Sequence, residues 1–378
     1  MRNIFTSVAP LLCVILITGQ VKALTVSANI KGTLPSALVE SSGLDHTGGT
    51  HFWSLNDSGD PKIFRIADDG TLTRTVTITN AVNRNWEDIA HDAARNFMFI
   101  GDFGNNNCDR TNLRIYKIPY PSGIAANTIA AEQITFEYED QARFPSPWMN
   151  FDVEAFLHFQ GQIFIFTKTD GNAIGYTKMY TVPDVAGHYV AMLVDSFYTN
   201  DRTTGATISP NGKSVVLISN THIHLFRNYT GNDFFHGTHV QINIAGGWTQ
   251  KEAVAFSSDR EIYMTDENTG SGNHLYYVDL SSWIPAAPLA VSKVPDEVRV
   301  SVYPNPANDI VNLSIQSEFK NASIGIFDIT GKLTYQSLIE NATSPFVIST
   351  ADLPAGVYFY RIYDDAKEVK TARLVVNH

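Results

Sequence analysis

Three glutamates stand at matching places in short segments that resemble one another. They are Glu87, Glu154 and Glu252, and each opens an apolar stretch of the kind that forms a β-strand. If the fold brings these positions together, the three carboxylates repel one another unless protons or a cation neutralise them. Ca²⁺ accepts a set of oxygen ligands completed by waters, so the glutamates predict a Ca²⁺ site. The sequence has no Cys/His spacing of the kind that binds zinc.

Four further polar residues could take part in hydrolysis next to such an ion. Asp57 and Asp102 end two apolar stretches and are candidates for a general base that orients a water. Lys168 and His222 are candidates for groups that offset developing negative charge. The sequence contains neither a nucleophile-elbow serine motif nor a glycine loop that cradles phosphate.

The elements that must position these residues form a repeat. Five times along the chain a short first strand is followed by an apolar second strand, a polar turn and a third strand. Ser42 and Thr204 occupy the place of the glutamate in the two repeats that lack one. The period of about 45–65 residues is typical of four-stranded propeller blades. The first strands line the channel of a propeller, so the matching residues are expected at one mouth.

The repeats predict an all-β fold, a five-bladed β-propeller over residues 24–291, with six blades as the alternative. A fourth strand follows four of the five repeats. The fifth repeat lacks one, and an unpaired strand, Leu24 to Ile30, precedes the first repeat. We expect this strand to complete the last blade, because closure by the two ends of the chain removes an exposed sheet edge.

Residues 300–378 form a separate module with four ordered motifs, which predict a small β-sandwich. They begin at Val300, Ile326, Leu353 and Lys370. The module resembles the type A C-terminal sorting domain of the type IX secretion system. The resemblance implies a Gram-negative bacterium of the Bacteroidetes group, the type IX secretion machinery as a partner, and release or attachment at the outer cell surface. A generic accessory sandwich is the alternative.

The N-terminus is typical of a signal peptide. Met1-Arg2-Asn3 is followed by an apolar run and by Ala23, so residues 1–23 are expected to be cleaved. The apolar run is too short for a confident membrane span. A polar stretch, 292–299, is expected to link the propeller to the C-terminal module.

The net charge of −11 argues against a nucleic-acid polymer or an anionic membrane as a partner. Such a charge is compatible with metal binding or with solubility alone.

The propeller also resembles the calcium-activated nucleotidases (apyrases) in its blade pattern. The residues that carry this resemblance are Ser42, Glu87, Glu154 and Glu252, with Trp53 to Gly59 and Ile63-Phe64-Arg65. It implies one Ca²⁺ on the channel axis, held by Ser42, Glu87, Glu154 and Glu252. Ser58 stands where that family has an arginine, and no Lys/Arg cluster for polyphosphate is visible. Phytase-like and senescence-marker-protein-like propellers are similar to a comparable degree.

Three classes of function therefore remain open. The first is a surface binding or interaction module whose ring is stiffened by Ca²⁺. The second is a metal-dependent extracellular hydrolase of phosphoesters or phosphoanhydrides. The third is a glycan-active enzyme, which needs carboxylates held apart across an open cleft. Alternatively, the glutamates are a solvated rim around a water-filled channel.

Overall fold

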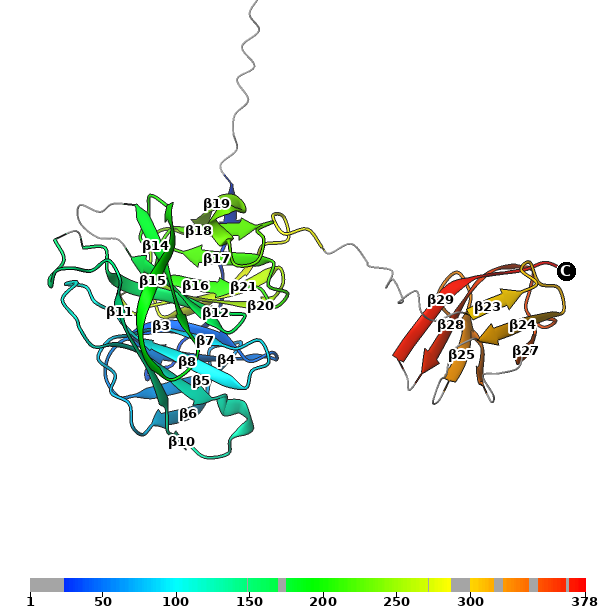
Figure 1. Cartoon of the computed structure of the whole chain (residues 1–378), viewed down its shortest axis with the longest axis horizontal. Helices are drawn as coiled ribbons and strands as arrows, with labels where there is room; N and C mark the ends of the chain where they lie inside the picture. The colour runs from blue at the N-terminus through cyan, green and yellow to red at the C-terminus, as the bar shows by residue number, and fades with distance from the viewer. Residues whose placement is uncertain are drawn as a thin grey trace, which may run out of the picture. The chain divides into compact units, whose positions relative to one another are not determined.

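The computed structural model describes residues 24–286, except 148, 169–174 and 271, and residues 300–378, except 316–321, 340–345 and 365–366 (Figure 1). The predicted signal peptide, 1–23, and the predicted linker, 292–299, lie outside the described residues. The chain divides into two compact units, 1–286 and 287–378.

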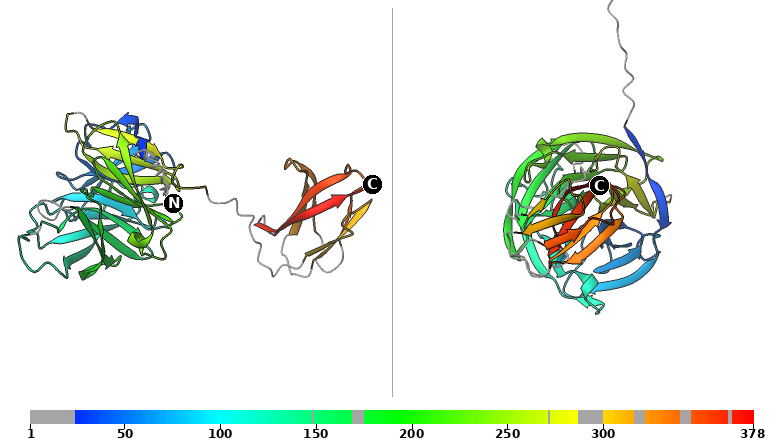
Figure 2. Two further views of the ribbon diagram at one scale, coloured as in Figure 1. Left: turned by 90° about the horizontal axis from the view of Figure 1, so that it is seen from above. Right: turned by 90° about the vertical axis from the view of Figure 1, so that its right-hand side faces the viewer.

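The first unit is a five-bladed β-propeller. Its innermost strands pack side by side in a closed ring, in the order β3, β7, β12, β16, β20 and back to β3. The right-hand view of Figure 2 follows the blades around this ring. Blade 1 is β3 (Ser41–His46), β4 (His51–Asn56), β5 (Lys62–Ala67) and β6 (Leu72–Ile78). Blade 2 is β7 (Trp86–His91), β8 (Phe97–Asp102), β9 (Leu113–Pro119) and β11 (Glu132–Tyr138). Blade 3 is β12 (Asp152–Phe159), β13 (Gln162–Lys168), β14 (Tyr176–Pro183) and β15 (Gly187–Tyr198). Blade 4 is β16 (Gly205–Ile208), β17 (Ser214–Ile218), β18 (His222–Arg227) and β19 (Thr238–Ala245). Blade 5 is β20 (Lys251–Ser258), β21 (Glu261–Asp266), β22 (His274–Asp279) and β2 (Asn29–Thr33).

The core is divided into apolar layers between neighbouring blades. One layer packs Trp53 of blade 1 against Ile89 of blade 2, and another packs Phe164 of blade 3 against Phe226 of blade 4. These strands are buried on both faces, which explains why the second strand of each repeat is a near-continuous apolar run. The closed ring of five innermost strands confirms the predicted count of five blades.

The N-terminal segment closes the ring, but in two parts. The sequence predicted that Leu24 to Ile30 form one strand and complete the last blade. In the structure β1 (Thr25–Ser27) runs parallel to β19 at the edge of blade 4. Only then does β2 pair antiparallel with β22 of blade 5. The segment thus covers one sheet edge and completes the next blade, which protects both from pairing with other chains.

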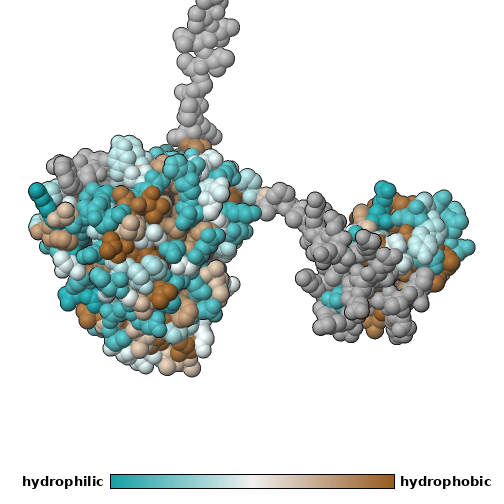
Figure 3. All heavy atoms as spheres, viewed as in Figure 1, coloured by the Kyte–Doolittle hydropathy of each residue, from teal (hydrophilic) through white to brown (hydrophobic). Residues whose placement is uncertain are grey.

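Two other outer edges are covered in the same way. The short β10 (Thr128–Ile129) pairs with β6, and the outermost strands β11 and β15 of blades 2 and 3 pair in parallel. β15 carries exposed apolar side chains at Val190, Met192 and Val194, and brown patches are visible over this part of the propeller in Figure 3. This apolar surface lies on the outer rim of blade 3, because β15 is the outermost strand of that blade.

The second unit is the predicted β-sandwich. One sheet contains β23 (Val300–Tyr303), β24 (Ile310–Ile315) and β27 (Phe346–Ser349). The other contains β26 (Leu333–Leu338), β25 (Ala322–Phe327), β28 (Gly356–Asp364) and β29 (Lys367–Val376). Leu313 of the first sheet and Ile326 of the second belong to one core. Gly331 has a φ of 86°, which suits the predicted turn after Thr330.

Candidate functional site

The residues predicted to line one mouth of the channel occupy equivalent places in the structure. The register of the innermost strand shifts at Ser42, Glu87, Glu154 and Glu252, each of which is the extra residue of a β-bulge. Thr204 takes the matching place just before β16, where its N–H donates to Ile218 O at 2.9 Å. A bulge re-aims its extra side chain away from the regular pleat. These five residues therefore occupy the same structural position in their blades.

The two hydroxyl slots connect neighbouring blades. Ser42 Oγ donates to Trp86 O at 2.7 Å, and Thr204 Oγ1 donates to Lys251 O at 2.5 Å. Each acceptor is the residue directly before the bulged glutamate of the next blade. The two hydroxyls thus hold the strands that position Glu87 and Glu252, and their oxygen lone pairs remain available as acceptors.

The three glutamates are buried and lie within electrostatic reach of one another. Glu87, Glu154 and Glu252 are 7%, 5% and 6% exposed. Burial raises the pKa of all three carboxyl groups. The negative charge of Glu252 raises the pKa of Glu154 further. The charges of Asp152 and Glu252 do the same for Glu87. The structure therefore brings the three glutamates among the four predicted metal ligands together at one mouth, which we call the acidic mouth.

Lys168 is the cation of the acidic mouth. Its ammonium group forms an ion pair with Glu154 Oε1. Burial opposes its charge, but the attraction of Glu154 and Glu252 outweighs this and raises the pKa of Lys168. Glu154 Oε2 is buried and meets no donor. With Asp152, four carboxylates face one ammonium group, which leaves three negative charges if all are ionised.

A second group of acidic residues lies beside the first. Burial and a hydrogen bond with Glu40 raise the pKa of Asp57 to about 7. Burial and the charge of Glu252 raise the pKa of Glu267 to about 8. Asp57 therefore lies where the sequence predicted it. Glu40 and Asp152 were missed, although Asp152 opens the same strand as Glu154 and could have been found from that position.

The structure does not bring Asp102 and His222 into this cluster. Asp102 is buried and paired with Arg110 at 3.0 Å and Arg114 at 3.7 Å, both beyond the second strand of its own blade. His222 Nδ1 is bonded to Asp201 Oδ2 at 2.6 Å. Burial alone would raise the pKa of Asp201, but hydrogen bonds from His224, Ser219 and His222 lower it to about 2. Both predicted residues are thus engaged by local partners.

A shared metal centre is not preformed at the acidic mouth. Within the described ranges, the one His/Cys/Asp/Glu group whose ligand atoms lie within 4.8 Å of one another is Asp195, Asp233 and His236, on blade 3 and the loop before β19. The glutamate side chains would have to draw together to share one ion. What fits a cation is the donor set itself, with buried carboxylates of raised pKa and the donor-free Glu154 Oε2.

Asp88 is fully buried on the innermost strand of blade 2, one residue after Glu87 and three before His91. Its Oδ1 accepts the N–H of Ile89 at 2.8 Å, and its Oδ2 accepts the N–H of Phe156 at 3.0 Å. The N–H of Ala206 in blade 4 also donates to this carboxylate. The inner edge of a propeller has no neighbouring strand, so its backbone donors need such partners. One side chain from blade 2 thereby ties three blades together.

Comparisons with known proteins identify the C-terminal module. A family model described as the secretion system C-terminal sorting domain matches residues 301–377. The predicted type IX sorting domain is therefore confirmed. No curated protein matches the chain. In the described part of the chain, no helix is long and apolar enough to cross a bilayer.

Solved structures similar to this chain are propellers of other kinds. The PQQ-bound aldose sugar dehydrogenase from Streptomyces coelicolor is 11% identical, with 68% of this chain and 98% of that chain covered and a TM-score of 0.41. The WD40 repeats of RRP9 are 10% identical, with 68% and 100% covered and a TM-score of 0.36.

Proposed function

Because residues 301–377 are a type IX secretion sorting domain, the protein is an exported cargo with a propeller, and we propose that this propeller is a Ca²⁺-dependent binding module. Glu87, Glu154 and Glu252 would hold the ion, with Ser42 beside them. The ion would supply positive charge that links the blades and offers open coordination positions to an extracellular ligand.

One observation carries this proposal: three buried glutamates converge on a mouth whose cation is Lys168. Without further positive charge the carboxylates take up protons, which is the meaning of their raised pKa values. A divalent ion removes the need for those protons. Ca²⁺ tolerates irregular sets of oxygen ligands, and waters complete its shell.

The contacts of the other candidates favour binding over hydrolysis. Asp102 is held by two arginines and His222 by Asp201, so neither faces the glutamates as a free acid or base. Asp57 is the exception. It lies beside the mouth with a pKa of about 7, which suits a general base. A metal-dependent hydrolase that uses Asp57 to orient a water is therefore the second candidate.

The test is thermal unfolding of the full chain in EGTA and in Ca²⁺. Saturation at about one hundred times Kd stabilises a protein by ~2.7 kcal/mol, which raises Tm by about 5–10 °C for a propeller of this size. The Glu87→Gln and Glu252→Gln variants should lose the rise. Glu137→Gln, on the exposed face of β11, is the matched control and should keep it.

An unchanged Tm of the wild type in Ca²⁺ would sink the proposal. If both glutamine variants keep the Tm rise in Ca²⁺, the ion binds elsewhere than at the acidic mouth. Nucleotides and phosphoesters added with Ca²⁺ then separate the two candidates, since turnover that is lost in Asp57→Asn would favour the hydrolase.

A further inference from the structure

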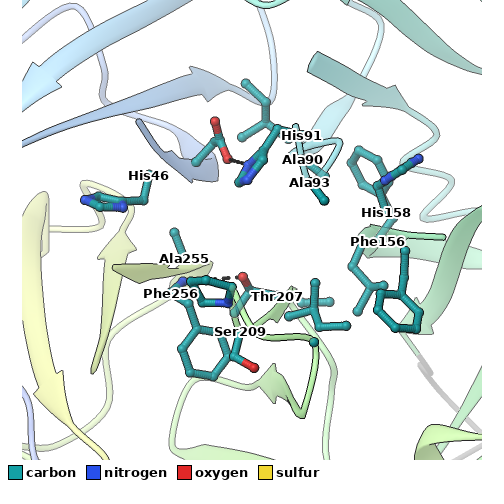
Figure 4. Close-up of a pocket in the computed structure, with 18 of the residues that line it drawn as sticks. His46, Ala90, His91, Ala93, Phe156, His158, Thr207, Ser209, Ala255 and Phe256 are labelled. Carbon is teal, nitrogen blue, oxygen red and sulfur yellow. Dashed lines mark hydrogen bonds and ion pairs between the residues drawn. The ribbon is translucent and has the colours of Figure 1, made fainter. Parts of the chain in front are cut away.

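The opposite end of the channel holds a cavity of about 300 Å³. The five innermost strands end there, and His46, His91 and His158 of blades 1–3 line it. Each histidine lies four residues after the bulged residue of its blade, which is about 13 Å along a strand. Figure 4 shows the three rings around the open space between the strands. We call this cavity the histidine pocket.

The His91 ring is oriented by a buried carboxylate. Its Nδ1 is bonded to Asp45 Oδ1, and the hydroxyl of Tyr120 donates to Asp45 Oδ2 at 2.8 Å. Asp45 is 3% exposed, and its two carboxylate oxygens accept hydrogen bonds from these two side chains. Because Nδ1 is engaged, Nε2 is the ring nitrogen of His91 left for a ligand in the pocket.

Arg95 adds a permanent positive charge to the same side. Its guanidinium donates to His46 O at 3.3 Å and rests over Gly48, where a Cβ would meet it at 3.5 Å. Of the residues that line the pocket, Asp45 and Arg95 carry full charges, and Asp45 is already bonded to His91. Asp45 is buried behind His91 and Tyr120, so the charged group that the pocket can offer a ligand is the Arg95 guanidinium.

On the other side of the pocket, large apolar side chains stand beside the polar Thr207, Ser209 and Asn211 of blade 4. At the place of the histidines, blades 4 and 5 carry Ile208 and Phe256. Phe156 and Ile89 are further apolar residues of the lining. Arg95 and His91 thus stand on blade 2, and the two phenylalanines that can hold an apolar body, Phe156 and Phe256, come from blades 3 and 5.

We propose that the histidine pocket binds a small organic acid with an aromatic body, an aryl-substituted carboxylate. The carboxylate is bound by the Arg95 guanidinium and by the Nε2–H of a His91 ring that carries both protons, and the aromatic body packs between Phe156 and Phe256. A cavity of this volume is at the small end of ligand sites, which suits a ligand of one ring and a short chain. Guanidinium–carboxylate pairs are strong and directional, so the acid group fixes the orientation.

The experiment is calorimetric titration of the full chain at pH 7 with 3-phenylpropanoate, 3-phenylpropanamide and inorganic phosphate. We expect the carboxylate to bind at least tenfold more tightly than the amide, since both have the same shape and only one is charged. Arg95→Gln keeps a donor for His46 O and should weaken the carboxylate at least tenfold while leaving the amide unchanged. His91→Phe should weaken it by a similar factor.

His188→Ala, on the exposed outer strand of blade 3, is the control and should bind as the wild type does. Equal binding of acid and amide, or no loss in Arg95→Gln, would overturn the charged subsite. Phosphate bound as tightly as 3-phenylpropanoate would overturn the aromatic ligand. Failure of all three probes to bind at millimolar concentration would overturn the site. Calcium should not change the affinity, so this outcome is independent of the acidic mouth.

Discussion

The two ends of one channel carry opposite chemistry although the same five strands build both. At the acidic mouth, carboxylates outnumber the single ammonium group of Lys168 and are held with raised pKa values. At the histidine pocket, Arg95 and three histidines share the lining with Phe156 and Phe256. Between them along the innermost strand of blade 2, Asp88 accepts backbone N–H groups from three blades. A repeat thus fixes where side chains point, while the residue type at each slot decides what each end can bind.

The largest effect is expected from Asp88→Ala, which removes the carboxylate that is bonded to three blades. The backbone N–H groups of Ile89, Phe156 and Ala206 lose their acceptor in a buried place. Each unsatisfied donor costs ~1–3 kcal/mol, so the free energy of unfolding should fall by about 4–6 kcal/mol. Urea denaturation measures it, with Glu137→Gln as the control. A loss below ~1 kcal/mol would mean that water replaces the carboxylate as the acceptor of these N–H groups.

Lys168→Met should destabilise the acidic mouth alone. Glu154 would be left buried without its ion-pair partner, which costs about 3–4 kcal/mol at neutral pH. Ca²⁺ should restore most of the lost free energy of unfolding, because the ion and the ammonium group neutralise the same carboxylates. Binding of 3-phenylpropanoate at the other end should stay within twofold of the wild type. If Ca²⁺ restores nothing, Lys168 alone is the cation of this mouth.

The pH dependence of stability separates the two ends in another way. The folded pKa values of about 7 for Asp57 and about 8 for Glu267 lie above their unfolded values near 4. The folded state therefore binds more protons over this interval, and stability falls as pH rises from about 4 to 8. Between pH 5 and pH 9 the two shifts set an upper limit of about 7 kcal/mol. Both side chains are partly exposed, so after screening by solvent we expect a loss of ~2 kcal/mol, which lowers Tm in EGTA by about 5 °C. Ca²⁺ or Glu267→Gln should flatten the drop; a Tm that rises with pH in EGTA would contradict the raised values.

The smallest effect is expected from His222→Ala. Its imidazole is bonded to Asp201 and takes no part in the contacts of the three glutamates described above. The Tm rise caused by Ca²⁺ should therefore equal that of the wild type within ~1 °C, a change of less than 0.5 kcal/mol. Loss of the Ca²⁺ effect in this variant would show that the Ca²⁺ site extends to the outer strands of blade 4.

Sequence patterns determined most of the architecture. The recurrence of Trp86-Glu87, Val153-Glu154 and Lys251-Glu252 before apolar runs predicted the blades and the equivalence of the glutamates, since β-strand alternation and a fixed repeat set the direction of each side chain. The motifs after Val300 predicted the sorting domain that the family model confirms. His46, His91 and His158 were missed, although the same alignment extended by four residues would have placed them in one ring.

Tertiary structure alone decided the partners. Lys168 pairs with Glu154, Asp88 reaches Phe156 of the next blade, and Asp102 turns to Arg110. The leading strand divides between blades 4 and 5, where a single strand was expected. A sequence pattern reports which face of a strand a residue occupies. Which groups meet across the channel depends on how closely the ring closes and on the bulge at each slot, and both arise only when all five blades are packed together.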